Sequence, residues 1–194
     1  WTKIASGSLH SNTKKYLYRM ISKIKTEIRL KEITLSDVNK TYQKWMNDSE
    51  IFRFSKQSYK KHSLKQIKEF ALDKKKSKNE FLYKILVYEN KKNKHIGNIK
   101  LGPINFENKT ADISYFIGEK NYWGQGITTK AIEMMISLAK KKFKLKKLQA
   151  GHWEKNIASK KVLLKNKFKL EGILKSQIQT KKGRINRYLY GLVI

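Results

Sequence analysis

The stretch Tyr122-Trp123-Gly124-Gln125-Gly126-Ile127-Thr128-Thr129 lies between a predicted strand and a predicted amphipathic helix. Its two glycines have no Cβ atom, so the backbone can pass close to an anion. The helix that follows would offer unpaired N–H groups and the positive end of its dipole. The stretch therefore indicates a phosphate-binding turn, although a G-x-G pair on its own more often marks a plain tight turn. Thr129 stands where a dinucleotide fingerprint would need a third glycine.

Hydrophobic periodicity on both sides of this stretch changes between strand-like and helix-like spacing. Strands are expected over residues 27–33, 81–89, 95–101, 111–117, 145–153, 172–180 and 185–193. Helices are expected over residues 36–46, 63–75, 130–142 and 156–166. The order β-α-α-β-β-β-α-β-α-β-β predicts an α+β fold with a mostly antiparallel sheet and one crossover unit at its centre.

Length and composition favour one compact domain with a hydrophobic core. The chain has 194 residues, of which 39% are hydrophobic, and residues 27–194 are interpreted as that domain. Residues 1–26 are interpreted as a basic leader or arm, in which Met20 is a candidate native start. No apolar stretch approaches the roughly 20 residues of a membrane span, and no signal peptide is recognised. A cytoplasmic protein is therefore expected.

The residue types exclude several kinds of site. Cysteine is absent, which excludes disulfide scaffolds, thiolate zinc sites and cysteine nucleophiles. The four histidines are scattered, so no metal site is expected. The formal net charge is +30, and the positive charges are supplied by 40 Lys and only five Arg. Nucleic-acid-binding proteins usually depend on Arg, whose planar group grips phosphates and guanine edges. A solvated lysine surface is therefore preferred to a specific nucleic-acid groove.

Three segments carry a family resemblance. Residues 122–129 and the preceding Asn121 are similar to a pyrophosphate loop written Q/R-x-x-G-x-G/A. Asn121 occupies the first position of this pattern, where the family has Gln or Arg. Asn156-Ile157-Ala158-Ser159 and the residues up to Phe168 are similar to an N-x-x-S…K-x-G-F helix, with Lys167 where glycine is usual. Residues 42–54 are similar to an early segment of the same family. Together the segments resemble the GNAT superfamily of acyl-CoA-dependent N-acyltransferases, especially the branch of ribosomal-protein N-terminal and sugar-amine acetyltransferases.

The resemblance implies a GNAT-like fold in which acetyl-CoA lies where two parallel strands splay apart, here residues 111–117 and 145–153. The cofactor contacts that it implies for this sequence are Phe116, Ile117, Gly124, Gln125, Gly126, Ile127, Thr128 and Asn156. Lys130 and nearby lysines would bind the adenosine phosphate as point charges.

The implied reaction is direct attack of a neutral amine on a thioester, which needs a proton acceptor, oxyanion stabilisation and a proton donor for the thiolate. Leu163 stands where the family usually has a tyrosine, so Ser159 is the candidate donor; its hydroxyl could instead bond a carbonyl four residues earlier. The candidate bases are Asp112, His152 and Glu154. Asp112 could equally be a solvent-facing strand carboxylate, Glu154 could cap the next helix, and water could take the proton.

The family binds its amine against the first two helices and the loop between them. The residues expected near the acceptor are Trp45, Asn47, Phe52, Phe54 and Tyr59. Aromatic clusters of this kind are more often part of a core. A small-molecule amine such as an amino-sugar nucleotide is favoured, because a strongly basic surface suits an anionic acceptor. Acetylation of protein N-termini is the alternative, and an inactive GNAT-like nucleic-acid-binding module is the rival from another class. A homodimer is one option for assembly.

Overall fold

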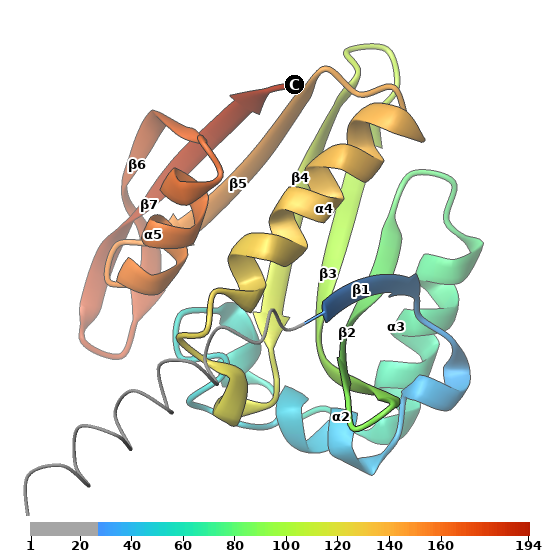
Figure 1. The fold of residues 1–194 in the computed structure, drawn as a ribbon. Coiled ribbons are helices and arrows are strands. Elements are labelled where there is room, and N and C mark those ends of the chain that lie inside the picture. Colours follow the sequence, from blue (N-terminus) through green and yellow to red (C-terminus); the bar gives the residue numbers. More distant parts are fainter. Residues whose placement is uncertain (1–26) are drawn as a thin grey trace, which may run out of the picture.

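A computed structural model of the chain describes residues 27–194, and the predicted leader or arm at residues 1–26 lies outside the described residues. Within this range seven strands form one sheet in the order β1-β2-β3-β4-β5-β7-β6. The strands are β1 (Glu27–Glu32), β2 (Phe81–Glu89), β3 (Lys92–Asn105), β4 (Thr110–Ile117), β5 (Lys147–Trp153), β6 (Lys169–Thr180) and β7 (Gly183–Val193). Only β4 and β5 pair in parallel. The predicted α+β fold with a central parallel pair is therefore confirmed (Figure 1).

The helices of the described range are α2 (Lys40–Met46), α3 (Leu64–Lys76), α4 (Ile127–Lys141) and α5 (Ile157–Lys165), with short 3-10 turns η1 (Leu35–Asp37), η2 (Lys56–Tyr59) and η3 (Lys120–Tyr122). The first predicted helix is divided into η1 and α2, because Val38 and Asn39 leave helical geometry and the Asn39 side chain caps α2. The third predicted helix begins at Ile127 instead of Lys130, directly after Gly126. No helix in this part of the chain is long and apolar enough to cross a membrane.

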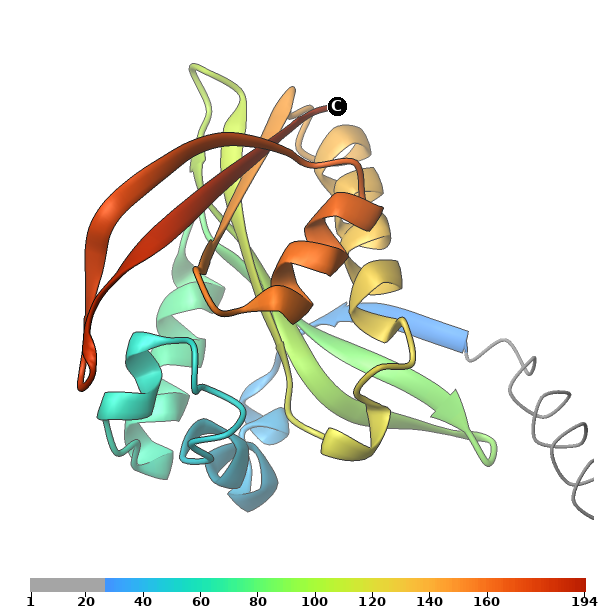
Figure 2. The same cartoon turned by 90° about the vertical axis from the view of Figure 1, so that its left-hand side faces the viewer.

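Helices cover both faces of the sheet (Figures 1 and 2). On one side, α4 and α5 pack over a large apolar cluster that includes Ile132, Met135 and Leu163, all fully buried. On the other side, α2 and α3 pack over a smaller cluster that includes Trp45 and Ile67. We call these two sides the α4 face and the α2–α3 face. Because strand side chains alternate, each strand contributes residues to both faces.

The parallel strands β4 and β5 pair over a short stretch and then separate. Their register begins at Thr110 opposite Lys147 and ends at Asp112 opposite Gln149. β4 runs on to Ile117 without pairing to β5, whereas β5 pairs along its length with β7. Figure 1 shows the two strands diverging beyond this point. The edge of β4 that faces β5 therefore has backbone groups available for an extended ligand.

Candidate active site

The glycine turn leaves the N-terminus of α4 open. Gly124 and Gly126 have φ angles of 76° and 79°, a left-handed conformation that favours glycine. A Cβ atom at either position would meet nothing within 4 Å. No side chain in the described range caps α4, and the amides of its first turn, such as those of Ile127 and Thr128, have no intrahelical acceptor. The turn can therefore donate several N–H groups to a phosphate.

Two side chains fix the shape of the turn. Trp123 Nε1 donates to the Ile117 carbonyl at 3.0 Å, and Gln125 Nε2 donates to the Asn121 carbonyl at 2.6 Å. The predicted cofactor residue Gln125 thus uses its side chain inside the turn, and its backbone amide is the group that can face a phosphate. The turn is connected to the end of β4 through Trp123.

Two predicted acceptor residues, Trp45 and Phe52, lie in the core. Trp45 Nε1 donates to Glu119 Oε1 at 3.0 Å, and its ring covers Gly118 so closely that a Cβ there would lie 2.1 Å from the indole. Phe52 packs on Phe116 with ring centroids 5.0 Å apart. Trp45 and Phe52 are 6% and 8% exposed. Both side chains therefore position the end of β4 from the α2–α3 face.

The other three predicted acceptor residues lie in the connection between α2 and α3. Asn47 closes this connection, because Nδ2 donates to the His62 carbonyl at 2.9 Å and Oδ1 accepts from the His62 amide at 2.8 Å. Phe54 is half-buried. Tyr59 is 51% exposed and stacks on Trp153 of β5, with ring centroids 6.4 Å apart. Of these residues, Tyr59 offers an accessible ring over the sheet.

Asp112 lies on the α2–α3 face at the last paired position before β4 and β5 separate. The residue is exposed, but partial burial of its carboxyl group still raises the pKa. The positive charges of Arg187 and Lys100 oppose this rise. A carboxylate with a raised pKa is a better proton acceptor near neutral pH. Position and pKa both suit Asp112 to receive the proton of an amine.

Of the other two candidate bases, His152 is buried and Glu154 is hydrogen-bonded to Asn186. His152 is 4% exposed and its ring lies on the α4 face between Tyr188 and Tyr190, with both centroids 5.3 Å away. Its Nδ1 lies 2.8 Å from a backbone carbonyl, and its Nε2 is buried with no partner in residues 27–194. Glu154 does not cap α5, because its carboxylate accepts from the backbone amide and the side-chain amide of Asn186.

The start of α5 brings two hydroxyl groups together. Asn156 Oδ1 caps the helix by accepting from the Ser159 amide at 3.1 Å. Ser159 Oγ lies 2.8 Å from Tyr115 Oη on β4, rather than against the carbonyl of its own preceding turn. Burial raises the pKa of Tyr115 to about 12, although the bond with Ser159 acts in the opposite direction. The phenol is therefore protonated at neutral pH and able to donate. The pair connects β4 to α5.

Tyr115 and Arg187 are functional candidates that the sequence reasoning did not select. The alternation of Ala111 to Ile117 places Tyr115 on the same face as the buried residue Ile113. That pattern could have directed attention to its hydroxyl. Arg187 carried a weaker signal, since it is one of five arginines in a lysine-rich chain.

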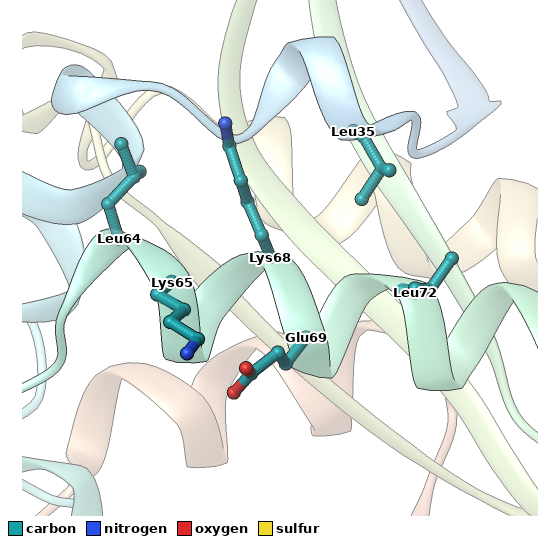
Figure 3. Close-up of a pocket in the computed structure, with 6 residues that line it drawn as sticks. All are labelled: Leu35, Leu64, Lys65, Lys68, Glu69 and Leu72. Atoms are coloured by element: carbon teal, nitrogen blue, oxygen red, sulfur yellow. The ribbon is translucent and has the colours of Figure 1, made fainter.

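A separate groove lies between η1 and α3. Its volume is about 340 Å³. The residues that line it are Leu35, Leu64, Lys65, Lys68, Glu69 and Leu72 (Figure 3). None of the predicted site residues belongs to this lining, so the groove is distinct from the candidate active site.

Comparison with known proteins identifies the family. A family profile described as "Acetyltransferase (GNAT) domain" matches residues 27–169. The chain is 25% identical over 172 residues to the uncharacterized N-acetyltransferase p20 of Bacillus licheniformis, covering 86% of this chain and 92% of p20. The fold is similar to that of RimL, a ribosomal L7/L12 alpha-N-protein acetyltransferase solved with coenzyme A (TM-score 0.75, 18% identity, 88% and 95% of the two chains). It is also similar to spermidine N-acetyltransferase from Vibrio cholerae, solved with CoA and spermine (TM-score 0.75, 15% identity, 86% and 95% of the two chains).

A parallel strand pair that separates beside a glycine turn and an open helix N-terminus matches the arrangement that the GNAT resemblance implies for this sequence. The family profile covers more than half of the chain, and the chain accordingly belongs to the GNAT family of acetyltransferases. The predicted superfamily and the predicted acyltransferase activity are confirmed. Residues 27–194 contain no cluster of three or more His, Asp or Glu that could hold a metal ion.

Proposed function

We propose that the chain is an acetyl-CoA-dependent N-acetyltransferase in which a neutral primary amine attacks the thioester directly. The observation that carries the proposal is the uncapped start of α4 behind Gly124 and Gly126, beside the end of β4 where pairing with β5 is lost. When bound, acetyl-CoA supplies an acetyl group that is already activated as a thioester.

The residues that would hold acetyl-CoA suit its chemistry. A Cβ atom at Gly124 or Gly126 would meet nothing within 4 Å, so a ligand can approach the turn closely, and the amides of the first turn of α4 can donate to the pyrophosphate. The β4 backbone near Phe116 and Ile117 can pair with the amide groups of the pantetheine arm, because it has no β5 partner there. Asn156 lies at the start of α5, and its Nδ2 makes no hydrogen bond within residues 27–194, so it can donate to the arm. Lys130 is exposed and can bind a phosphate as a point charge.

Two groups would move the protons of the reaction. Asp112 accepts the proton of the attacking amine, with a pKa raised by partial burial. Ser159 donates to the leaving thiolate, Tyr115 replaces that proton through its 2.8 Å contact with the serine hydroxyl, and solvent water returns a proton to the tyrosine oxygen. The pair takes the role of the tyrosine that the family usually has at the position of Leu163. Leu163 is apolar and fully buried in the core, so it cannot donate a proton.

A small-molecule amine, such as an amino-sugar nucleotide, is the acceptor that we favour. The exposed ring of Tyr59, stacked on Trp153, offers an apolar surface to a sugar or a base ring. Acetylation of a protein N-terminus is the alternative, favoured by the similarity of the fold to RimL. A panel of amino sugars, polyamines and peptides, with release of free thiol as the readout, would separate the two.

Thermal unfolding with acetyl-CoA, CoA or an RNA oligomer tests the proposal. A ligand at about 100 times its Kd stabilises a protein by about 2.7 kcal/mol, which corresponds to a rise in Tm of about 5–10 °C for a chain of this size. Gly126→Val should abolish the rise. Gly183→Val is the matched control, because Gly183 also has a positive φ and open space but lies at the start of β7, next to the β6–β7 turn.

The outcomes of this test are distinct. A rise with acetyl-CoA and CoA that survives in Gly183→Val and is lost in Gly126→Val supports the proposed site. No rise with either CoA species would refute the enzyme, and a rise with RNA alone would favour the nucleic-acid-binding module. Equal acetyl-CoA binding in Gly126→Val and the wild type would show that the pyrophosphate lies elsewhere.

A further inference from the structure

Arg187 is a cation on the α2–α3 face that the proposed mechanism does not use. It lies on β7 opposite Trp153 of β5, and the β6–β7 hairpin curves toward the side where α2 and α3 lie (Figure 2). The guanidinium lies against Gly151, because an added Cβ at that position would be 3.2 Å from Nε and 3.4 Å from Nη2. Gly151 follows Gln149 on the same face, and Gln149 is the partner of Asp112. The guanidinium therefore reaches toward the point where β4 and β5 separate.

The guanidinium of Arg187 has no anionic partner in the part of the chain that the structure describes. No carboxylate of residues 27–194 lies within 4 Å of it, and it donates no hydrogen bond within that range. Other strand arginines are engaged. Arg29 pairs with Glu27 at 2.7 Å, and Arg184 donates to the Ser176 carbonyl at 2.6 Å. Arg187 is also exposed, so its donors are open to a ligand.

The charge of Arg187 acts at the candidate active site. Burial raises the pKa of Asp112, and Arg187 is the first of the two cations that oppose this rise. The second cation, Lys100, is already paired with Glu80. Trp153, which stacks on Tyr59, is the β5 residue opposite Arg187. Gly151, which contacts the guanidinium, lies on β5 between Trp153 and Gln149, the partner of Asp112. Arg187 thus stands between an accessible aromatic surface and the candidate base.

We propose that Arg187 binds an oxyanion, a carboxylate or a phosphate, carried by the amine acceptor and so selects anionic amines over neutral or polycationic ones. The inference rests on the proposed function, because it requires the acceptor to lie on the α2–α3 face. A guanidinium presents two parallel donors that fit either oxyanion. Arg187 would hold the oxyanion and Tyr59 would support the body of the acceptor, which leaves the amine free to reach Asp112.

Gly151 supports this specificity through its lack of a side chain. A Cβ at Gly151 would lie 3.1 Å from the Tyr188 carbonyl as well as close to the guanidinium. A larger side chain would therefore displace Arg187 from the strand surface. A polycation on the same face would meet the unpaired guanidinium of a chain whose net charge is +30, which disfavours its binding.

Binding of matched amines tests the proposal. Glucosamine 6-phosphate is compared with glucosamine, and alanine with alaninamide, by calorimetric titration in saturating CoA; the two pairs separate phosphate from carboxylate. Arg187→Gln should weaken binding of the member that carries the phosphate or carboxylate by about 10- to 100-fold, and binding of the member that lacks it by less than about threefold. Arg187→Lys keeps the positive charge but loses the two parallel donors of the guanidinium. Its affinity for the oxyanion-bearing amine should lie between those of the wild type and Arg187→Gln. Arg184→Gln, the matched control, removes the same charge from the same strand and should preserve the preference.

Several results would overturn the role of Arg187. One is a wild type that prefers neither amine carrying an oxyanion, which includes failure of all four amines to bind. Another is a preference that survives in Arg187→Gln. An equal loss of the preference in Arg184→Gln would assign the preference to overall charge and would also overturn the role of Arg187. Acetyl-CoA binding in the same preparation separates the two proposals. A chain that binds acetyl-CoA without preferring anionic amines refutes only the role of Arg187, whereas loss of acetyl-CoA binding refutes the proposed function.

Discussion

Replacing Gly118 by alanine should loosen the contact that holds α2 against the end of β4. The alanine Cβ would lie 2.1 Å from Cδ2 and 2.4 Å from Cγ of the Trp45 indole, well inside the roughly 3.5–4.0 Å of a favourable carbon–carbon contact. Trp45 is buried and its Nε1 is bound to Glu119. The ring can therefore move away only if it gives up this hydrogen bond or displaces α2.

The cost of Gly118→Ala has two parts. Overpacking a buried contact costs about 1–3 kcal/mol. Loss of a hydrogen bond to a charged group costs about 1.5–3 kcal/mol. Because relief of the first part produces the second, we expect a total of about 2–4 kcal/mol rather than the full sum. At about 2–4 °C per kcal/mol for a chain of this size, Tm should fall by about 5–15 °C.

Urea unfolding followed by circular dichroism measures this loss. Gly172→Ala is the matched control, because its Cβ would meet nothing within 4 Å, and it should stay within about 0.5 kcal/mol of the wild type. A Trp45→Leu background offers a second test, since a smaller side chain makes room for the methyl group. There, Gly118→Ala should cost at least about 1 kcal/mol less. Wild-type stability of Gly118→Ala, or the same cost in both backgrounds, would refute the reasoning.

Three further predictions concern the proton-transfer groups and the charged network. Asp112→Asn should lower kcat by about 100-fold or more with unchanged affinity for acetyl-CoA; full turnover in steady-state assays would remove Asp112 from the mechanism. Ser159→Ala and Tyr115→Phe should each lower kcat by about 100-fold, and the double variant should lose little more, because the hydroxyls act as one unit; multiplied losses would contradict this. Burial would raise the pKa of Glu80, but hydrogen bonds from Lys100 and Lys74 outweigh it and hold the pKa below its usual range. Its contribution is therefore present above the unfolded pKa and is lost as pH falls through the lower folded pKa. Glu80→Gln should destabilise the fold by about 1 kcal/mol at pH 7, with a gap in urea midpoint that shrinks below about pH 4; a gap that persists there would argue against the ion pairs as its source.

Local sequence signals were sufficient for much of the fold. The residue type of Gly124 and Gly126 permits the tight turn, and strand alternation before the turn and helical spacing after it are properties of neighbouring residues. The bounds were less accurate where tertiary geometry intervenes. β5 begins at Lys147 rather than Leu145, because Lys144 adopts a positive φ of 54° and Leu145 turns into the core.

The side of each strand that meets the ligand could not be read from residue type. Trp45 of α2 and Tyr59 of η2 are both aromatic residues that were expected near the acceptor. Trp45 instead fills the space beside Gly118, whereas Tyr59 remains exposed. His152 is a plausible base by chemistry, yet it points to the α4 face between two tyrosines. The Tyr115–Ser159 contact joins residues distant in sequence, so it depends on how α5 is placed against β4.

Binding of acetyl-CoA compared with S-acetylpantetheine, which lacks the pyrophosphate and the phosphorylated adenosine, tests most directly, together with a variant of the glycine turn, whether that turn holds acetyl-CoA. Calorimetric titration of the wild type should show a preference of about 100-fold or more for acetyl-CoA, and Gly126→Val should reduce the preference below about tenfold while Gly183→Val preserves it. Equal affinity of the wild type for the two thioesters, or an unchanged preference in Gly126→Val, would contradict the assignment.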